Sequence, residues 1–88
     1  MSLAERSRVA ASIGSKKVAI RQHIENLSLR YCELMLNPDD PRFFEEISRI
    51  TDGIAEAQVS LAVLEQIHGT ACDLVAQARR EELRGNRP

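Results

Sequence analysis

His68 and Cys72 are the two residues of this sequence whose types and spacing come closest to a metal-binding pair. Residues four apart lie on one face of an α-helix, where an imidazole and a thiol supply two of the four ligands of a zinc site. The other candidates, His23 and Cys32, are expected far away along a helical hairpin. Two ligands do not complete a zinc site, so we expect no metal and no cofactor. We interpret His68 as a packed or partner-facing histidine whose imidazole can make a pH-dependent contact.

Neighbouring carboxylates are the next candidates for chemistry, as general acids or bases. The pairs are Asp39 with Asp40, Glu45 with Glu46, and Glu81 with Glu82. A general acid requires a buried environment that perturbs its protonation, and the surface of a small helical protein offers none. No glycine-rich phosphate-binding loop follows a strand pattern either. We therefore expect no catalytic residue and no enzymatic activity.

Charge is unevenly distributed along the 88 residues, although the net charge is only −1. Residues 1–22 carry five basic side chains and one acidic one, residues 23–73 carry three basic and ten acidic, and residues 74–88 carry four basic and two acidic. If the two ends meet in a hairpin, they form a basic tip that contains Arg6, Arg8, Lys16, Lys17, Arg21, Arg79, Arg80, Arg84 and Arg87. The tip lacks the interleaved aromatic residues of a nucleic-acid-binding surface. Nucleic acid is therefore the least favoured partner, and solvated helix ends explain these residues.

Two apolar ladders with alternating steps of four and three residues predict two long amphipathic helices. The first ladder contains Ala10, Ile13, Ile20, Ile24, Leu27, Tyr31 and Leu34. The second contains Phe43, Ile47, Ile50, Ile54, Ala57, Leu61, Leu64, His68, Ala71, Val75 and Ala78. Lys17 interrupts the first ladder. With no tryptophan in the chain, Ile, Leu, Val and Ala must form the core, as is typical of an all-α protein.

The segment Asn37-Pro38-Asp39-Asp40-Pro41 separates the two ladders. Proline disfavours a helical conformation in the residue before it, and Asp40 followed by Pro41 is typical of a helix start. So short a connection makes the two helices antiparallel neighbours. We predict one domain, residues 1–88, that forms a coiled-coil-like antiparallel two-helix hairpin. Its parts are a helix over about 3–36, a turn over 37–40, a helix over about 41–83 and a frayed tail over 84–88.

Two features concern the start of the first helix. Ser2 and Glu5 have the spacing of a capping box, which predicts a helical start near residue 3. Gly14 weakens the stretch that follows, so a kink or a separate short helix before residue 15 is an alternative. Whether residues 1–14 are ordered without a partner is left open.

The cellular compartment is the last property that the sequence bears on. The N-terminus has no apolar segment of the signal-peptide kind, and no apolar run has the length of a membrane span. In an antiparallel hairpin, Cys32 and Cys72 would lie about 40 Å apart, too far for a disulfide. We expect a cytoplasmic protein with two free thiols.

Apolar residues outside the ladders predict a surface for a further protein. The second helix carries a stripe that lies roughly 80–120° around the helix from Ala57, near the middle of its ladder: Val63, Ile67 and Leu74. The first helix carries a weaker patch: Val18, Leu29 and Leu36. A single antiparallel neighbour covers only the ladder face, so we expect these residues to contact a third element. A different protein and a second copy that completes a four-helix bundle are equally compatible with this pattern. A third interpretation is that Ile13 and Val9 of the same chain fold over the stripe.

Several features between Ile20 and Gly69 recur together in one known family. They are an Ile-x-x-x-Ile-Glu sequence in the first helix, Leu-Met-Leu at its end, a short polar loop, Asp40-Pro41-Arg42-Phe43-Phe44 at the start of the second helix, and then Ile54, Ala55, Ala57, Leu61, Val63, Leu64, Ile67 and His68-Gly69. This pattern resembles the small E-type (YscE-like) cochaperones of type III secretion needle systems. In that family the hairpin binds a small helical-repeat chaperone, and the pair keeps the needle subunit unpolymerised in the cytoplasm.

The resemblance implies a non-enzymatic chaperone subunit with protein partners. Phe43 would take the place of an aromatic residue that commonly opens the second helix in that family. The arginine-rich segment after Leu74 lies outside the resemblance. The alternatives are a self-associating helical scaffold or regulator without a client and, less favoured, a small nucleic-acid-associated protein.

Overall fold

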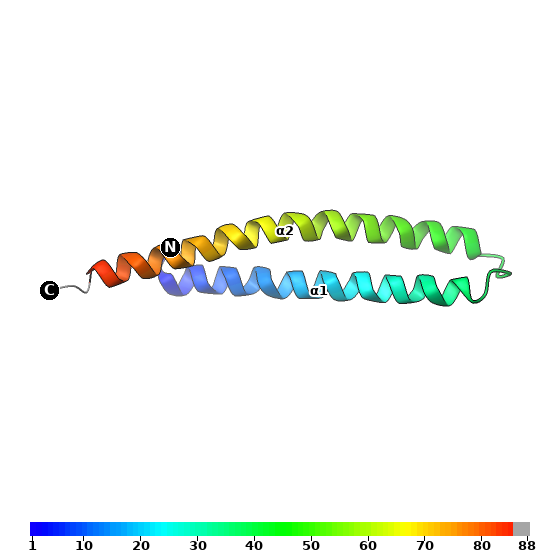
Figure 1. Ribbon diagram of the computed structural model, residues 1–88, viewed down its shortest axis with the longest axis horizontal. Helices are drawn as coiled ribbons and strands as arrows, with labels where there is room; N and C mark the ends of the chain where they lie inside the picture. The colour runs from blue at the N-terminus through cyan, green and yellow to red at the C-terminus, as the bar shows by residue number, and fades with distance from the viewer. Residues whose placement is uncertain (86–88) are drawn as a thin grey trace.

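The computed structural model describes residues 1–85, which form two long antiparallel α-helices joined by a short turn (Figure 1). Helix α1 spans Leu3–Met35 and helix α2 spans Phe43–Gly85. The Cα atoms extend over 74 × 15 × 13 Å, so the molecule is a rod two helices wide. The last turns of α2 project beyond the start of α1 (Figure 1). The predicted all-α antiparallel hairpin is confirmed.

Helix α1 begins with the capping box. The Ser2 hydroxyl accepts a hydrogen bond from the Glu5 backbone N–H at 3.1 Å, and the Glu5 carboxylate accepts one from the Ser2 backbone N–H at 3.3 Å. The bond from the Ser2 backbone and then that with its side chain lower the pKa of the Glu5 carboxyl group below its ordinary value of 4.5. Two of the unpaired N–H groups at the helix start are thereby satisfied.

Helix α1 continues without a break through Gly14, so the kink or separate N-terminal helix considered from the sequence is absent. A glycine inside a helix costs about 1 kcal/mol relative to alanine, which packing against a neighbouring helix readily offsets. At Gly14 that neighbour is His68 of α2, whose Nε2 atom would lie 3.5 Å from a Cβ atom built there.

Helix α2 starts two residues later than predicted, at Phe43 instead of Pro41. Asp40 does cap the chain, because its Oδ1 atom accepts a hydrogen bond from the Arg42 backbone N–H at 2.8 Å. The next bond runs from the Phe43 N–H to the Asp40 carbonyl, a three-residue step, and the four-residue spacing begins with Glu46 and Arg42. One tight turn of the 3₁₀ kind therefore precedes the α-helix.

The predicted ends of the helices shift by one or two residues. Helix α1 ends at Met35 with Leu36 as its C-cap, and α2 continues to Gly85. Of the tail expected over 84–88, residues 84 and 85 thus belong to α2, and residues 86–88 lie outside the described part. Neither helix in residues 1–85 has an apolar stretch long enough to cross a bilayer.

The core is a thin line of contact between the two ladders, which we call the seam. Within residues 1–85 the buried side chains are Ile50, Ala71 and Ala78. The other ladder residues are half-buried, because each helix has only one neighbour and keeps its flanks in solvent. Gly53 brings α1 close to α2: a Cβ atom at this position would lie 3.3 Å from Leu27 Cδ1. A hairpin with so little enclosed surface leaves most of its apolar side chains partly exposed.

Candidate functional site

Two ion pairs between the helices identify the two sides of the seam. On one side Arg30 Nη2 lies 2.9 Å from Glu46 Oε2, and on the other Arg21 Nη2 lies 3.2 Å from Glu65 Oε1. Residues seven apart keep the same side of a helix that is packed along a partner. The positions of α2 in register with Glu46 therefore flank one side of the seam, and those in register with Glu65 flank the other.

These positions define two faces of α2. The Glu46 face contains every seventh residue of α2 counted from Glu46, and the residue three positions after each of these. Its members are Glu46, Arg49, Gly53, Glu56, Ser60, Val63, Ile67, Thr70, Leu74, Gln77, Glu81 and Arg84. The Glu65 face consists of residues in register with Glu65 and those four positions after each: Phe44, Ser48, Thr51, Ala55, Gln58, Ala62, Glu65, Gly69, Cys72, Ala76, Arg79 and Leu83. The first face has charges at both ends and an apolar middle. The second face is rich in small side chains in its middle and carries the exposed Phe44 and Leu83 towards its ends.

The stripe predicted on the second helix lies on the Glu46 face. Val63 is 51% exposed and Ile67 is 46% exposed, so half of each side chain is in contact with solvent. Leu74 is half-buried, and its carbonyl accepts a hydrogen bond from Arg6 Nη1 at 3.0 Å, so α1 covers part of this residue.

Val9 of α1, three heptads before Arg30 and therefore on the same side of the seam, is also exposed. The sequence alone suggested Val9 only as a residue that could fold over this stripe, whereas in the structure Val9 is itself exposed beside it.

The patch predicted on the first helix lies elsewhere. Val18, Leu29 and Leu36 are all exposed, along the outer side of α1 and at its end. Val18 is fourteen residues before Cys32, and Cys32 lines a groove together with Thr51, Ala55 and Gln58 of the Glu65 face. Val18 therefore lies on the side of α1 that adjoins the Glu65 face. The two predicted patches therefore do not join into one surface, because they face away from the seam on different sides of the rod.

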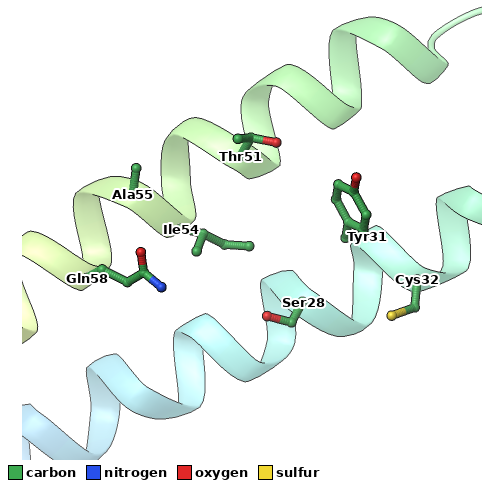
Figure 2. A pocket seen from close by; sticks show the side chains of 7 residues that line it. All are labelled: Ser28, Tyr31, Cys32, Thr51, Ile54, Ala55 and Gln58. Atoms are coloured by element: carbon green, nitrogen blue, oxygen red, sulfur yellow. The ribbon is translucent and has the colours of Figure 1, made fainter.

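A groove of about 490 Å³ opens between the helices near the turn, on the side of the Glu65 face (Figure 2). Its lining consists of Ser28, Tyr31, Cys32, Thr51, Ile54, Ala55 and Gln58. In Figure 2 the Tyr31 ring and the Ile54 side chain lie between the two helices, while the Cys32 thiol lies at the α1 rim. Small side chains at Ser28 and Ala55 leave the space open. Sequence reasoning missed this groove, for which small residues next to the large ladder residues are the available signal.

The two polar ladder residues meet across the seam. Lys17 Nζ lies 3.3 Å from His68 Nδ1, and Cys72 Sγ lies 3.7 Å from His68 Nε2. An ammonium group only donates, so Nδ1 accepts and the proton of a neutral imidazole lies on Nε2, which then points to the thiol. His68 is thus packed between polar neighbours. In residues 1–85 no three His, Cys, Asp or Glu side chains are grouped so that they can hold a metal ion.

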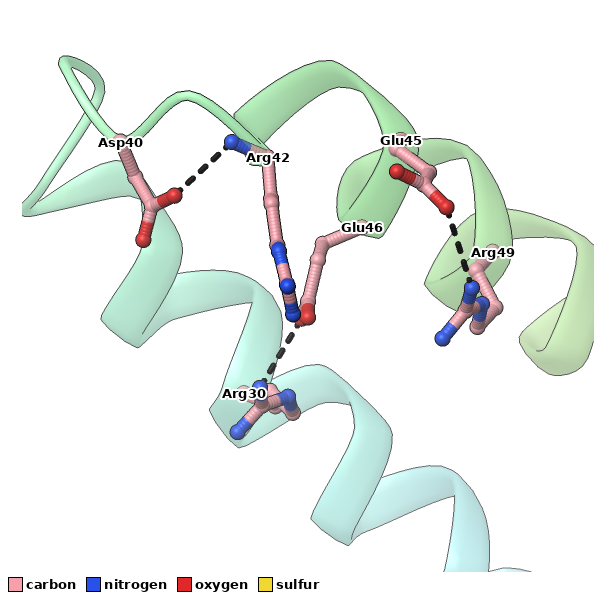
Figure 3. A network of polar contacts seen from close by, with 6 residues as sticks. All are labelled: Arg30, Asp40, Arg42, Glu45, Glu46 and Arg49. Carbon is pink, nitrogen blue, oxygen red and sulfur yellow. Dashed lines mark hydrogen bonds and ion pairs between the residues drawn. The ribbon is translucent and has the colours of Figure 1, made fainter.

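The turn end of the rod carries a cluster of exposed charged side chains (Figure 3). Besides the pair of Arg30 and Glu46, it contains Arg49, whose Nη2 lies 3.3 Å from Glu45 Oε1 one helical turn away. Exposed ion pairs of this kind contribute about 0.2–1 kcal/mol each. Arg42, Glu45, Glu46 and Arg49 line a hollow of about 280 Å³, in which Glu45 is exposed and Glu46 is half-buried.

The basic tip is only partly free. Arg6 donates to the Leu74 carbonyl, Lys17 contacts His68 in the seam, and Arg21 pairs with Glu65. Both cysteines are free and exposed. Arg87, which the sequence analysis assigned to the tip, lies outside the described residues.

Comparison of this chain with known protein families, with curated proteins and with solved structures finds no match.

Proposed function

We propose that this chain is a non-enzymatic, protein-binding cochaperone of a bacterial type III secretion system. In this proposal the hairpin pairs with a small helical-repeat chaperone, and the pair keeps the needle subunit unpolymerised in the cytoplasm. The observation that carries the proposal is the exposure of Val63 and Ile67 at the middle of the Glu46 face, 51% and 46% respectively. The resemblance across Ile20–Gly69 supports the choice of partner.

The physical argument starts from the thin core. Fully burying a valine or isoleucine side chain stabilises by about 1.5–3 kcal/mol, so covering the exposed halves of Val63 and Ile67 contributes about 1 kcal/mol each. Binding energy in protein interfaces concentrates in a few such central side chains. An apolar middle flanked by charged residues also has the layout of an interface core with a polar rim.

Co-expression tests the proposal. The tagged chain is produced together with a helical-repeat chaperone and a needle subunit encoded beside it. The complex is purified through the tag, and its mass is measured by native mass spectrometry. The wild-type chain is expected to yield a stoichiometric complex. Ile67→Asp is expected to abolish it while helicity by circular dichroism is retained, because Ile67 lies off the seam.

A matched variant makes the result specific to one face. Ala62→Asp introduces the same carboxylate on the Glu65 face of α2, where Ala62 is exposed, and is expected to leave the complex intact. Equal loss of binding in both variants, or unfolding of Ile67→Asp, would contradict the assignment of Val63 and Ile67 to a partner-binding surface.

A self-associating scaffold without a client is the second candidate, and the charge distribution favours it. Residues 1–22 carry five basic side chains and one acidic one, whereas residues 23–73, which include the turn end, carry three basic and ten acidic side chains. Two copies that lie side by side in opposite directions would bring these opposite charges together.

A further inference from the structure

The Glu46 face of α2 has an internal symmetry. Its members alternate in steps of three and four residues, so they follow one side of the helix and can face another helix along its length, with apolar side chains at Val63, Ile67 and Leu74. Every member has a counterpart that lies the same number of residues from position 65 in the opposite direction along the sequence. The counterparts are Val63 and Ile67, Ser60 and Thr70, Glu56 and Leu74, Gly53 and Gln77, Arg49 and Glu81, and Glu46 and Arg84.

Two copies of α2 that pack in opposite directions about a two-fold axis at residue 65 therefore place each residue opposite its counterpart, and the pairs are complementary except for Glu56 opposite Leu74. Ile67 lies opposite Val63 of the second copy at the centre. Towards the ends, Arg49 lies opposite Glu81, and Glu46 opposite Arg84. A two-fold axis generates each of these contacts twice.

Other arrangements lose this complementarity. Moving the second copy by seven residues in one direction places Glu81 opposite Glu56, which are like charges, and moving it the other way places Ile67 opposite Glu56. A parallel arrangement would put the basic tips of both copies side by side and the acidic turn ends side by side. Like charges across an interface cost free energy and suppress the wrong register.

The existing contacts are compatible with this pairing. Arg49 and Glu45 have side chains that are 74% and 70% exposed, and Arg30 is also exposed beside Glu46 (Figure 3). Glu81 of the second copy would join the pair of Arg49 and Glu45. Arg84 of the second copy would join the pair of Arg30 and Glu46. On the other half of the face, the hydrogen-bond partner of Glu81 within its own chain is the Gln77 amide, at 3.3 Å.

The available area is sufficient. Residue 65 lies next to the midpoint of α2, Phe43–Gly85, so two copies would overlap along nearly the whole helix, about 60 Å. A strip of this length and about 10 Å wide, the diameter of one helix, covers roughly 600 Å² per copy, which lies at the lower end of the range for specific complexes.

We infer that a second copy of this chain covers the Glu46 face, with the two α2 helices antiparallel about a two-fold axis at residue 65. This inference goes beyond the cochaperone proposal and does not depend on it. In the free chain the second copy covers Val63 and Ile67, and a different partner that uses the same side chains has to displace it.

Sedimentation equilibrium of the purified full chain at low ionic strength tests the inference, because exposed charge pairs are screened by salt. The wild-type chain is expected to sediment as a dimer of the 9.9 kDa chain. Glu81→Arg and Arg49→Glu are each expected to raise the dimer dissociation constant about tenfold, since two attractive pairs become repulsive. The double variant with both charges exchanged is expected to recover wild-type affinity to within about threefold.

Two further variants make the test independent of simple charge loss. Glu25→Arg changes charge by the same amount on the other side of the rod, seven residues before Cys32, and is expected to leave the dimer unchanged. Glu56→Ala removes the carboxylate opposite Leu74 of the second copy and is expected to tighten the dimer about threefold.

The inference is overturned by a monomer mass at every concentration up to about 0.1 mM. It is equally overturned by a dimer that is insensitive to Glu81→Arg, or by an exchanged variant as weak as the single ones. All of these measurements use the chain alone, so a monomer would leave the cochaperone proposal standing, and failure of the co-expression experiment would leave the dimer standing.

Discussion

Two isoleucines of the same helix should respond very differently to truncation. Ile50 is 3% exposed and lies in the seam, whereas Ile67 is 46% exposed on the Glu46 face. Ile→Ala removes three carbon atoms. At about 0.8 kcal/mol per buried methylene, this lowers the free energy of unfolding by about 2.4 kcal/mol at Ile50, and a residual cavity raises the loss towards about 3 kcal/mol. For Ile67 half of the lost surface was already in water, so about 1 kcal/mol remains. Alanine's better helix propensity offsets about 0.4 kcal/mol in both variants.

The expected difference between the two variants is therefore about 2 kcal/mol in the free energy of unfolding. Urea titration followed by circular dichroism at 222 nm measures it, at a chain concentration low enough that self-association does not contribute. A two-state fit with unchanged slope identifies the change as one of stability. Equal losses in Ile50→Ala and Ile67→Ala would refute the reasoning, because they would place both side chains in the same environment.

Three further predictions follow from single contacts. Gly69→Ala should stabilise the hairpin by about 1 kcal/mol in the same urea titration, because nothing lies within 4 Å of the added Cβ atom, and Gly53→Ala should gain less because its contact is tight. The pKa of the Glu5 carboxyl group is lowered in the folded chain, so the contribution of Glu5 to stability is complete above pH 4.5 and is lost as the pH falls through the lowered pKa. The melting temperatures of the wild-type chain and Glu5→Gln should therefore differ at neutral pH and converge in acid. Lys17→Ala should cost about 1 kcal/mol by leaving His68 Nδ1 without its donor, whereas replacing Lys17 and His68 together by leucine should keep or raise the melting temperature.

The hairpin and the direction of its stripe could be predicted because both follow from periodicity. The ladder containing Ile50 and His68 keeps its phase for the whole of α2, and the residues from Asn37 to Pro41 leave room only for a turn. The azimuth of Val63 and Ile67 on a helical wheel is a property of spacing alone, and both are half-exposed as that spacing predicts. Helix α2 starts two residues later than the proline pattern predicts, because the tight hydrogen bond between the Phe43 N–H and the Asp40 carbonyl depends on local geometry.

The remaining features depend on how the two helices are aligned. Lys17 and His68 stood out in the sequence as polar residues in apolar ladders, but their contact requires the register between α1 and α2, which the two ladders do not specify separately. Leu74 was expected to be free, yet the Arg6 side chain reaches across the seam to its carbonyl. The groove beside Tyr31 likewise arises only where small residues of both helices meet.

Methyl NMR of the isoleucine, leucine and valine side chains tests most directly whether the Glu46 face is the contact surface of this protein. Spectra of the full chain are recorded at increasing concentration and again with the helical-repeat chaperone and needle subunit added. We predict that the resonances of Val63 and Ile67 shift or broaden, while those of Val18 and Leu83, on the other side of the seam, stay in place. Changes confined to Val18 and Leu83, with Val63 and Ile67 unaffected in both series, would contradict this prediction.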